Sequence, residues 1–123
     1  MITVIGNLKG GSGKSTLAFN LGVWLARHSA SVVAYDLDPQ CTLTDVIEVR
    51  REDGHQPVLT VHQLHKVDAK QLQSFAGEVL VDVGAANIVA MQLAIEVADR
   101  VVIPGPPSQA DVWATQRFLG IVR

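Results

Sequence analysis

The stretch Asn7-Leu-Lys-Gly-Gly-Ser-Gly-Lys-Ser-Thr16 decides the fold of this chain, because it joins a β-rich run to a helical pattern. The run before it, Ile2–Gly6, is short and apolar, and the segment Lys14–His28 carries apolar side chains at helical spacing. Glycines in such a turn let successive backbone N–H groups point at an anion, and the first helical turn adds its own free N–H groups. This context predicts a phosphate-binding loop.

The charged and hydroxyl groups of this loop have distinct predicted parts. Lys14 would place a point charge on the β and γ phosphates of a nucleotide, and Ser15 would offer its hydroxyl to Mg²⁺. The alternative is a glycine-rich strand–helix turn with a chance Gly-Lys-Ser, and the flanking strand and helix argue against it. The remaining residues expected to line the nucleotide are Gly10, Gly11, Ser12, Gly13 and Thr16.

Short β-rich runs and helical patterns alternate along the chain, which is typical of a parallel α/β sheet. The predicted strands are Ile2–Gly6, Ser31–Leu37, Glu78–Val83 and Arg100–Ile103. The predicted helices are Lys14–His28, Thr42 to about Glu52, Asp68–Ala76, Asn87–Ala98 and one that begins at Ser108. Residues 53–77 are the least regular part of the pattern, with a loop at Asp53-Gly54 and Pro57.

Two details of these helices follow from spacing. One face of the first helix combines Leu17, Leu21, Trp24, Leu25 and His28, so we expect Trp24 to lie in the core, and Trp113 likewise. Thr42-Leu-Thr-Asp45 has the spacing of a capping box, which predicts how the second helix begins.

Three aspartates lie close to the carboxyl ends of predicted strands. Alternation puts Asp36 and Asp38 on the same side of the chain, where the two carboxylates would repel each other unless a cation, water or lysine lay between them. Asp82 ends the apolar run Val79-Leu-Val-Asp82, the Walker B form, in which an acid holds a water of the Mg²⁺ shell opposite Ser15. Aspartates that cap helices or simply end buried strands are the alternative in each case.

The phosphate loop also carries a specific resemblance. Leu8 replaces the first glycine of Gly-x-x-x-x-Gly-Lys-[Ser/Thr], and Lys9 begins Lys-Gly-Gly-x-Gly-Lys-Ser, which resembles the deviant Walker A loop of the ParA/MinD family of ATPases. Asp36-Leu-Asp-Pro-Gln40 is similar to the Asp-x-Asp-Pro-Gln box of ParA proteins, although Cys41 stands where the family often has glycine. Val83-Gly-Ala-Ala86 looks more like ParF-type partition ATPases, and Pro104-Gly-Pro-Pro-Ser108 resembles the family's Pro-x-x-Pro-Ser loop.

The resemblance implies roles for four residues. Lys9 would reach across an ATP-bound dimer to the partner's phosphates, unless it is simply an exposed loop lysine. Asp38 would orient the attacking water, and Asp36 would support the Mg²⁺ hydration shell or the loop. Pro107 would lie near the nucleotide base, or belong to a plain proline-rich connection. Together with Ser15 and Asp82, which the loop and strand patterns assign to Mg²⁺, the expected metal residues are Ser15, Asp36, Asp38 and Asp82.

Fold class and function follow as expectations. We expect an α/β fold of the P-loop NTPase type: one domain over residues 1–123, with a mostly parallel sheet, helices on both faces, and the family's C-terminal strands and helices missing. The implied activity is a Mg-ATP-dependent ParA-type switch for plasmid or chromosome segregation that cycles between ATP and ADP. The implied partners are a second copy in a dimer or polymer, a ParB-type centromere-binding protein, and non-specific DNA contacted through residues outside this chain. A MinD-like or other cargo-positioning ATPase, and a nucleotide-binding regulator without turnover, are the alternatives.

Composition agrees with this interpretation. The 123 residues are 48% hydrophobic and 18% charged with a net charge of −2, so we expect a cytoplasmic globular domain that does not insert in a membrane. Nucleoid association stays open as an alternative location. The single cysteine rules out an internal disulfide and the cluster-bridging cysteines of a nitrogenase-type iron protein. His62 and His65 lie three residues apart, but no acid or cysteine completes a metal set.

Overall fold

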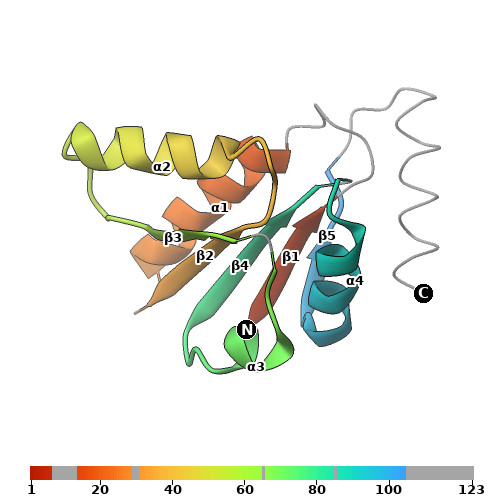
Figure 1. Cartoon of the computed structure of the whole chain (residues 1–123). Coiled ribbons are helices and arrows are strands. Elements are labelled where there is room, and N and C mark those ends of the chain that lie inside the picture. Colours follow the sequence, from red (N-terminus) through yellow and green to blue (C-terminus); the bar gives the residue numbers. More distant parts are fainter. Residues whose placement is uncertain (7–13, 29–30, 65, 85, 105–123) are drawn as a thin grey trace.

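A computed structural model describes residues 1–6, 14–28, 31–64, 66–84 and 86–104 of the chain (Figure 1). Strands and helices alternate along it. The strands are β1 (Ile2–Gly6), β2 (Val32–Asp36), β3 (Thr60–Gln63), β4 (Glu78–Val83) and β5 (Arg100–Val102). The helices are α1 (Lys14–His28), α2 (Thr42–Glu52), α3 (Ala69–Gln73) and α4 (Ile88–Val97).

The strands form one sheet in the order β3-β2-β4-β1-β5, and every pair in it is parallel. β4 therefore lies between β1 and β2, although it follows both in the sequence. In this register Asp82 of β4 lies opposite Ile5 of β1 on one side and Asp36 of β2 on the other. Because all strands are parallel, their carboxyl ends meet at one edge, which is where open α/β sheets bind ligands.

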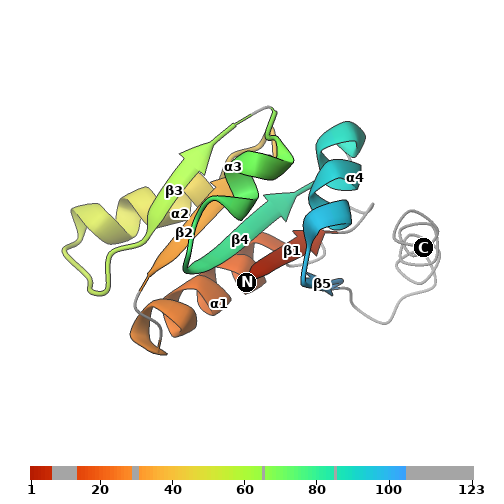
Figure 2. The same cartoon turned by 90° about the horizontal axis from the view of Figure 1, so that it is seen from below.

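Both faces of the sheet are covered. In Figures 1 and 2, α1 and α2 pack on one face, and α3 and α4 pack on the other. Ile5 and Leu80 point toward α1 and α2, while Val4 and Val81 point toward α3 and α4. Strands buried on both sides read as near-continuous apolar runs, which explains why β1 and β4 were visible in the sequence. The predicted fold class is confirmed.

The predicted count of four strands is wrong, because β3 adds a fifth within the described residues. β3 has the sequence Thr60-Val-His-Gln63 and is mostly exposed, so it lacks the apolar pattern that marks a buried strand. Its pairing with β2, which places Thr60 opposite Val33, is a tertiary contact that no local pattern encodes. The predicted helix Asp68–Ala76 shortens to α3, with Asp68 accepting the Gln71 N–H as its N-cap.

The prediction that Trp24 lies in the core is also wrong. Its side chain is 56% exposed and stacks on His28, with ring centroids 4.5 Å apart. The buried stripe of α1 instead includes Ala18, Gly22 and Leu25. A Cβ on Gly22 would meet Leu59 and Leu80 at 3.3 Å, so small residues let α1 lie close to the sheet. Trp113 and the helix predicted from Ser108 lie outside the described residues.

The predicted capping box of α2 does not form. The helix begins at Thr42 as expected, but its N-cap is Cys41, whose side chain makes no capping hydrogen bond. Cys41 has φ 58°, a left-handed conformation that favours glycine, and this explains why glycine would suit the position.

The predicted helix Asn87–Ala98 is confirmed as α4, with Asn87 as its N-cap. Among the described helices, none combines the length and the apolar character that crossing a membrane requires.

Candidate nucleotide-binding site

Lys14 is the centre of a polar cluster at the carboxyl edge of the sheet. It is the first residue of α1 and is only 8% exposed. Its Nζ donates to Asp38 Oδ2 at 3.1 Å and forms an ion pair with Asp82 Oδ1. The sequence raised the question of a lysine between Asp36 and Asp38, and the structure instead places one between Asp38 and Asp82. An ammonium group at the start of a helix, beside the predicted phosphate loop, is well placed to attract an anion.

Asp82 is the second-last residue of β4 and is fully buried. Its Oδ2 accepts a hydrogen bond from Ser15 Oγ at 3.0 Å, so the predicted partners Ser15 and Asp82 do lie together. Burial raises the pKa of Asp82 above its ordinary value, against the opposing effects of Lys14 and Ser15, and the charge of Asp36 adds to the rise. The protein therefore holds this carboxylate where a cation is needed to stabilise its charge.

The oxygen donors of Ser15 and Asp82 fit a magnesium ion that is also bound by substrate phosphates and water. Within the described ranges, no group of three or more His, Cys, Asp or Glu could hold a metal ion. The Ser15 hydroxyl and the Asp82 carboxylate are hard oxygen ligands, which Mg²⁺ prefers. Because Mg²⁺ is usually bound through one or two protein groups together with substrate phosphates and water, two adjacent oxygen donors are sufficient for it.

Asp38 lies in the turn between β2 and α2. Its Oδ1 accepts the Gln40 N–H at 3.0 Å, and its Oδ2 accepts from Lys14. Burial alone would raise the pKa of Asp38, but the Gln40 N–H and the Lys14 ammonium outweigh it and hold the pKa below its ordinary value. Asp38 is thus an ionised acceptor at neutral pH, with 18% of its side chain still exposed.

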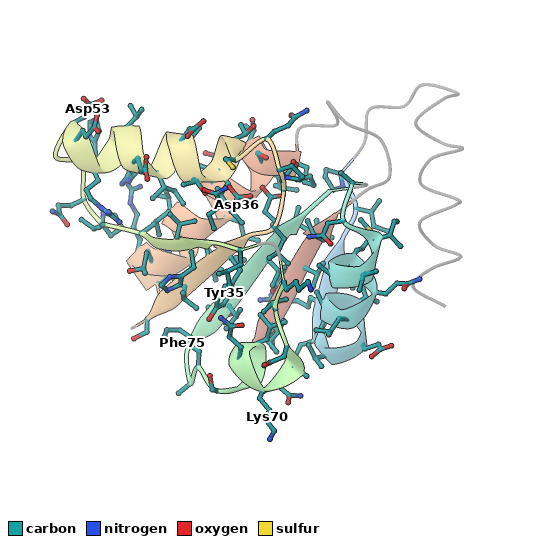
Figure 3. All side chains as sticks on the ribbon, in the orientation of Figure 1. Tyr35, Asp36, Asp53, Lys70 and Phe75 are labelled. Carbon is teal, nitrogen blue, oxygen red and sulfur yellow. The ribbon has the colours of Figure 1, made fainter. Side chains whose placement is uncertain are left out.

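Asp36 ends β2 beside the start of α2 (Figure 3), and it is fully buried. Its Oδ2 accepts from the backbone N–H of Thr44 at 3.0 Å and from the Thr44 hydroxyl at 2.6 Å. Its Oδ1 accepts the backbone N–H of Asp38 at 3.1 Å. These contacts hold the turn after β2 and the start of α2, and both predicted parts of Asp36, in the Mg²⁺ shell and in support of the loop, stay predictions.

Two residues of this site were missed in the sequence. Thr44 was assigned to a capping box, and only the fold shows that its hydroxyl turns to Asp36. Gly84 follows β4, and a Cβ there would come within 3.0 Å of Asp38 Oδ2, so glycine gives Asp38 its room. The one available signal was the Gly-Ala segment after the Walker B aspartate.

The other predicted site residues are only partly covered. Thr16 is exposed on the first turn of α1. The remaining predicted site residues all lie outside the described residues: Lys9, Gly10, Gly11, Ser12, Gly13 and Pro107. Their roles remain predictions.

Comparison with known proteins places the chain in a family. Residues 3–122 match the CobQ/CobB/MinD/ParA nucleotide binding domain, and the chain belongs to that family. It is 36% identical over 112 residues to the chromosome-partitioning ATPase Soj of Thermus thermophilus, covering 85% of this chain and 45% of that protein. It is 32% identical over 123 residues to the maintenance of carboxysome distribution protein A of Halothiobacillus neapolitanus, covering 96% of this chain and 56% of that protein. The chain thus spans about half the length of these relatives.

Solved structures confirm the fold. A plasmid partition protein from Borrelia burgdorferi matches with a TM-score of 0.78 and 21% identity, over 99% of this chain and 72% of that one. The pNOB8 ParA, solved bound to non-specific DNA, matches with a TM-score of 0.75 and 19% identity, over 96% of this chain and 57% of that one. At these identities the likeness establishes the shared architecture.

Proposed function

We propose that this chain is the Mg-ATP-binding part of a ParA-type partition ATPase, a molecular switch that dimerises with ATP and separates after hydrolysis. One observation carries the proposal: Lys14, at the start of α1, joins the carboxylates of Asp38 and Asp82, and Ser15 is bonded to the latter. A cation, a metal-ligating hydroxyl and two acids with different environments are the parts that phosphoryl transfer needs. Family membership supports the same assignment.

The chemistry assigns a separate role to each residue. Lys14 would exchange its carboxylate partners for phosphate oxygens when nucleotide binds, which couples binding to rearrangement of Asp38 and Asp82. Ser15 and Asp82 would hold Mg²⁺, which when bound neutralises phosphate charge. The depressed pKa of Asp38 keeps its carboxylate ionised, so it can accept a hydrogen bond from an attacking water and orient it. Lys9, supplied by the partner subunit, would stabilise charge on the transferring phosphoryl group.

The partners follow from the relatives. Soj is named a chromosome-partitioning ATPase, and pNOB8 ParA was solved on non-specific DNA. We therefore propose that the whole protein works in the cytoplasm on the nucleoid, with a ParB-type centromere-binding protein stimulating hydrolysis. DNA contacts would come from residues outside this chain, because the net charge of −2 offers no excess of cations to phosphates.

A second candidate is a cargo-positioning ATPase. The carboxysome distribution protein of Halothiobacillus neapolitanus aligns over 96% of this chain. Both candidates require the same ATP-dependent assembly, and they differ in the cargo adaptor that stimulates it. A regulator that binds nucleotide without turnover is separated from both by phosphate release, which Asp38→Ala should abolish only in a true ATPase.

The deciding experiment measures the molar mass of the Asp38→Ala chain by light scattering, with ADP and then with ATP and Mg²⁺. A monomer that becomes a dimer only with ATP supports the switch. Lys9→Ala should bind ATP as a monomer but fail to assemble, and normal assembly would refute its role in the partner's site. A chain that binds nucleotide and stays monomeric in every state would contradict the dimerising switch for these 123 residues.

A further inference from the structure

The start of α2 has no cap of its own. The first N–H groups of a helix lack partners within the helix and need acceptors from elsewhere. Cys41 occupies the N-cap position without a side-chain capping bond. The acceptor comes instead from Asp36 at the end of β2, which receives the backbone N–H of Thr44 in the first turn. A buried carboxylate at a helix N-terminus is also favoured by the helix dipole.

Thr44 contributes a second donor to the same oxygen. Its hydroxyl donates to Asp36 Oδ2 at 2.6 Å, at the short end of the range for O–H···O hydrogen bonds. Thr44 is 8% exposed and Asp36 is fully buried, so water does not compete freely for this contact. Two donors from one residue fix both the position and the rotation of the Asp36 carboxylate. Its other oxygen, Oδ1, is thereby aimed at the turn that follows β2.

That second oxygen reaches Asp38. The Asp38 backbone N–H donates to Asp36 Oδ1 at 3.1 Å, and the Asp38 carboxylate meets Lys14 at 3.1 Å. Gly84 lies against the Asp38 carboxylate, since a Cβ at this glycine would be 3.0 Å from Asp38 Oδ2. A continuous set of hydrogen bonds thus runs from the hydroxyl of Thr44, through Asp36, to the acid beside Lys14.

We propose that Thr44 is a positioning residue for ATP hydrolysis. Its hydroxyl holds the Asp36 carboxylate, and Asp36 in turn holds the backbone of Asp38. Asp38 is thereby kept where its carboxylate can orient the attacking water. This inference rests on the proposed function, since it gives the hydrolytic acid Asp38 a support. Thr44 itself touches neither nucleotide nor water in this scheme. Its removal should therefore slow hydrolysis while leaving nucleotide binding, which depends on Lys14, almost unchanged.

The test compares hydroxyl-free and hydroxyl-bearing variants of the full chain. Thr44→Val keeps the shape, Thr44→Ala favours the helix, and Thr44→Ser restores the hydroxyl. Thr42→Val is the matched control, because Thr42 is an exposed threonine in the same helical turn. Single-turnover hydrolysis of ATP with Mg²⁺ and titration with a fluorescent ATP analogue separate the chemical step from binding. Amide hydrogen exchange at Asp38 and Asp45 measures how well the backbone of the turn is held, and it does not require ATP hydrolysis.

We expect Thr44→Val and Thr44→Ala to slow hydrolysis by about 10- to 100-fold, the cost of slightly misplacing a catalytic group, with ATP affinity within about twofold of wild type. Thr44→Ser should recover most of the rate, and Thr42→Val should match wild type. An equal loss of rate in the serine variant, or a loss of affinity that parallels the loss of rate, would overturn the proposal.

Failure of the proposed function has a different signature. If the wild-type chain binds ATP but releases no phosphate, hydrogen exchange alone decides the positioning role. The Asp38 amide should then exchange about tenfold faster in both hydroxyl-free variants, while Asp45, which donates to Cys41 O, stays unchanged. Unchanged exchange at Asp38 would remove Thr44 from any role in placing that turn.

Discussion

The ends of β2 and β4 present the same residue in two different environments. Asp36 and Asp82 lie directly opposite each other on neighbouring strands, and both are fully buried. Asp82 is bonded to the Lys14 ammonium and the Ser15 hydroxyl. Among the described residues, the hydrogen-bond donors to Asp36 are neutral: two from Thr44 and the backbone N–H of Asp38. The cost of burying the carboxylate is therefore offset by a cation at Asp82 and by neutral hydrogen-bond donors at Asp36.

The difference separates an exchangeable site from a structural one. Lys14 has a flexible four-carbon side chain, so it can leave Asp82 for a phosphate oxygen without moving the backbone. Two of the donors on Asp36 are backbone N–H groups, of Asp38 and Thr44, and these cannot leave without moving the backbone of the turn or the start of α2. Burial alone would not distinguish a nucleotide-responsive carboxylate from a supporting one, whereas the identity of its partners does.

Removing the shared cation should have the largest effect. Lys14→Ala deletes the anchor for the β and γ phosphates and leaves Asp82 buried without its cation. We expect ATP affinity to fall by more than about 100-fold, and the free energy of unfolding to drop by about 3 kcal/mol, as when one partner of a buried ion pair is lost. Titration with a fluorescent ATP analogue and urea unfolding measure the two effects. Lys70→Ala, an exposed lysine on α3 (Figure 3), is the control, and unchanged ATP affinity in Lys14→Ala would remove Lys14 from the phosphate site.

The supporting carboxylate of Asp36 should matter for the stability of the fold as well as for the position of Asp38. Asp36→Asn replaces one carboxylate oxygen with an amide nitrogen. Both oxygens of Asp36 accept hydrogen bonds from described donors, so at least one buried N–H or O–H loses its acceptor. We expect the free energy of unfolding to fall by about 2–3 kcal/mol, the cost of a lost bond to a buried charged group. Urea unfolding measures it, with Asp45→Asn, an exposed acid in the same helical turn, as the control. A loss no greater than that of the control would show that the Thr44 and Asp38 hydrogen bonds do not hold Asp36.

The exchangeable carboxylate should affect binding in opposite directions with and without metal. Asp82→Asn frees Lys14 from one of its two acids, so ATP affinity in EDTA should rise by about fivefold, or about 1 kcal/mol. With Mg²⁺ the same variant should bind more weakly than wild type, because a metal-holding oxygen is lost. Parallel titrations in EDTA and in Mg²⁺ measure both. An unchanged ratio of the two affinities would contradict the assignment of Asp82 to the metal.

The smallest expected effect sharpens the comparison at the turn after β2. Cys41 adopts φ 58°, which costs an L-residue about 1–2 kcal/mol. Glycine avoids this cost, but it loses more conformational entropy on folding, which offsets part of the stabilisation. Cys41→Gly should therefore raise the free energy of unfolding by about 0.5–1 kcal/mol in urea. Cys41→Val should lower it, because a β-branched residue is poorly suited to this conformation. Destabilisation by glycine would mean that the contact of Gln63 with Cys41 Sγ outweighs the backbone strain.

Local patterns accounted for the parts of the fold whose residues are buried on both sides or lie in one regular helix. β1, β4, α2 and α4 were predicted close to their observed bounds, because apolar runs and helical periodicity are local signals. The exposed strand β3 was missed, and Trp24 was wrongly placed in the core. In both cases the outcome depended on contacts with distant segments: the pairing of β3 with β2, and the packing of α1 on the sheet. A local pattern does not contain that information.

For the candidate site, the sequence by itself determined the identities: a lysine and a serine at a helix start, and aspartates at the ends of parallel strands, in an order that predicts nucleotide chemistry. Only the tertiary structure decided which partner each aspartate receives. Strand order placed β4 between β1 and β2, so Lys14 reaches Asp82 and Asp38, while the start of α2 reaches Asp36. The physical reason is that residue type sets what a group can donate or accept, whereas packing of distant segments sets what lies within hydrogen-bonding distance.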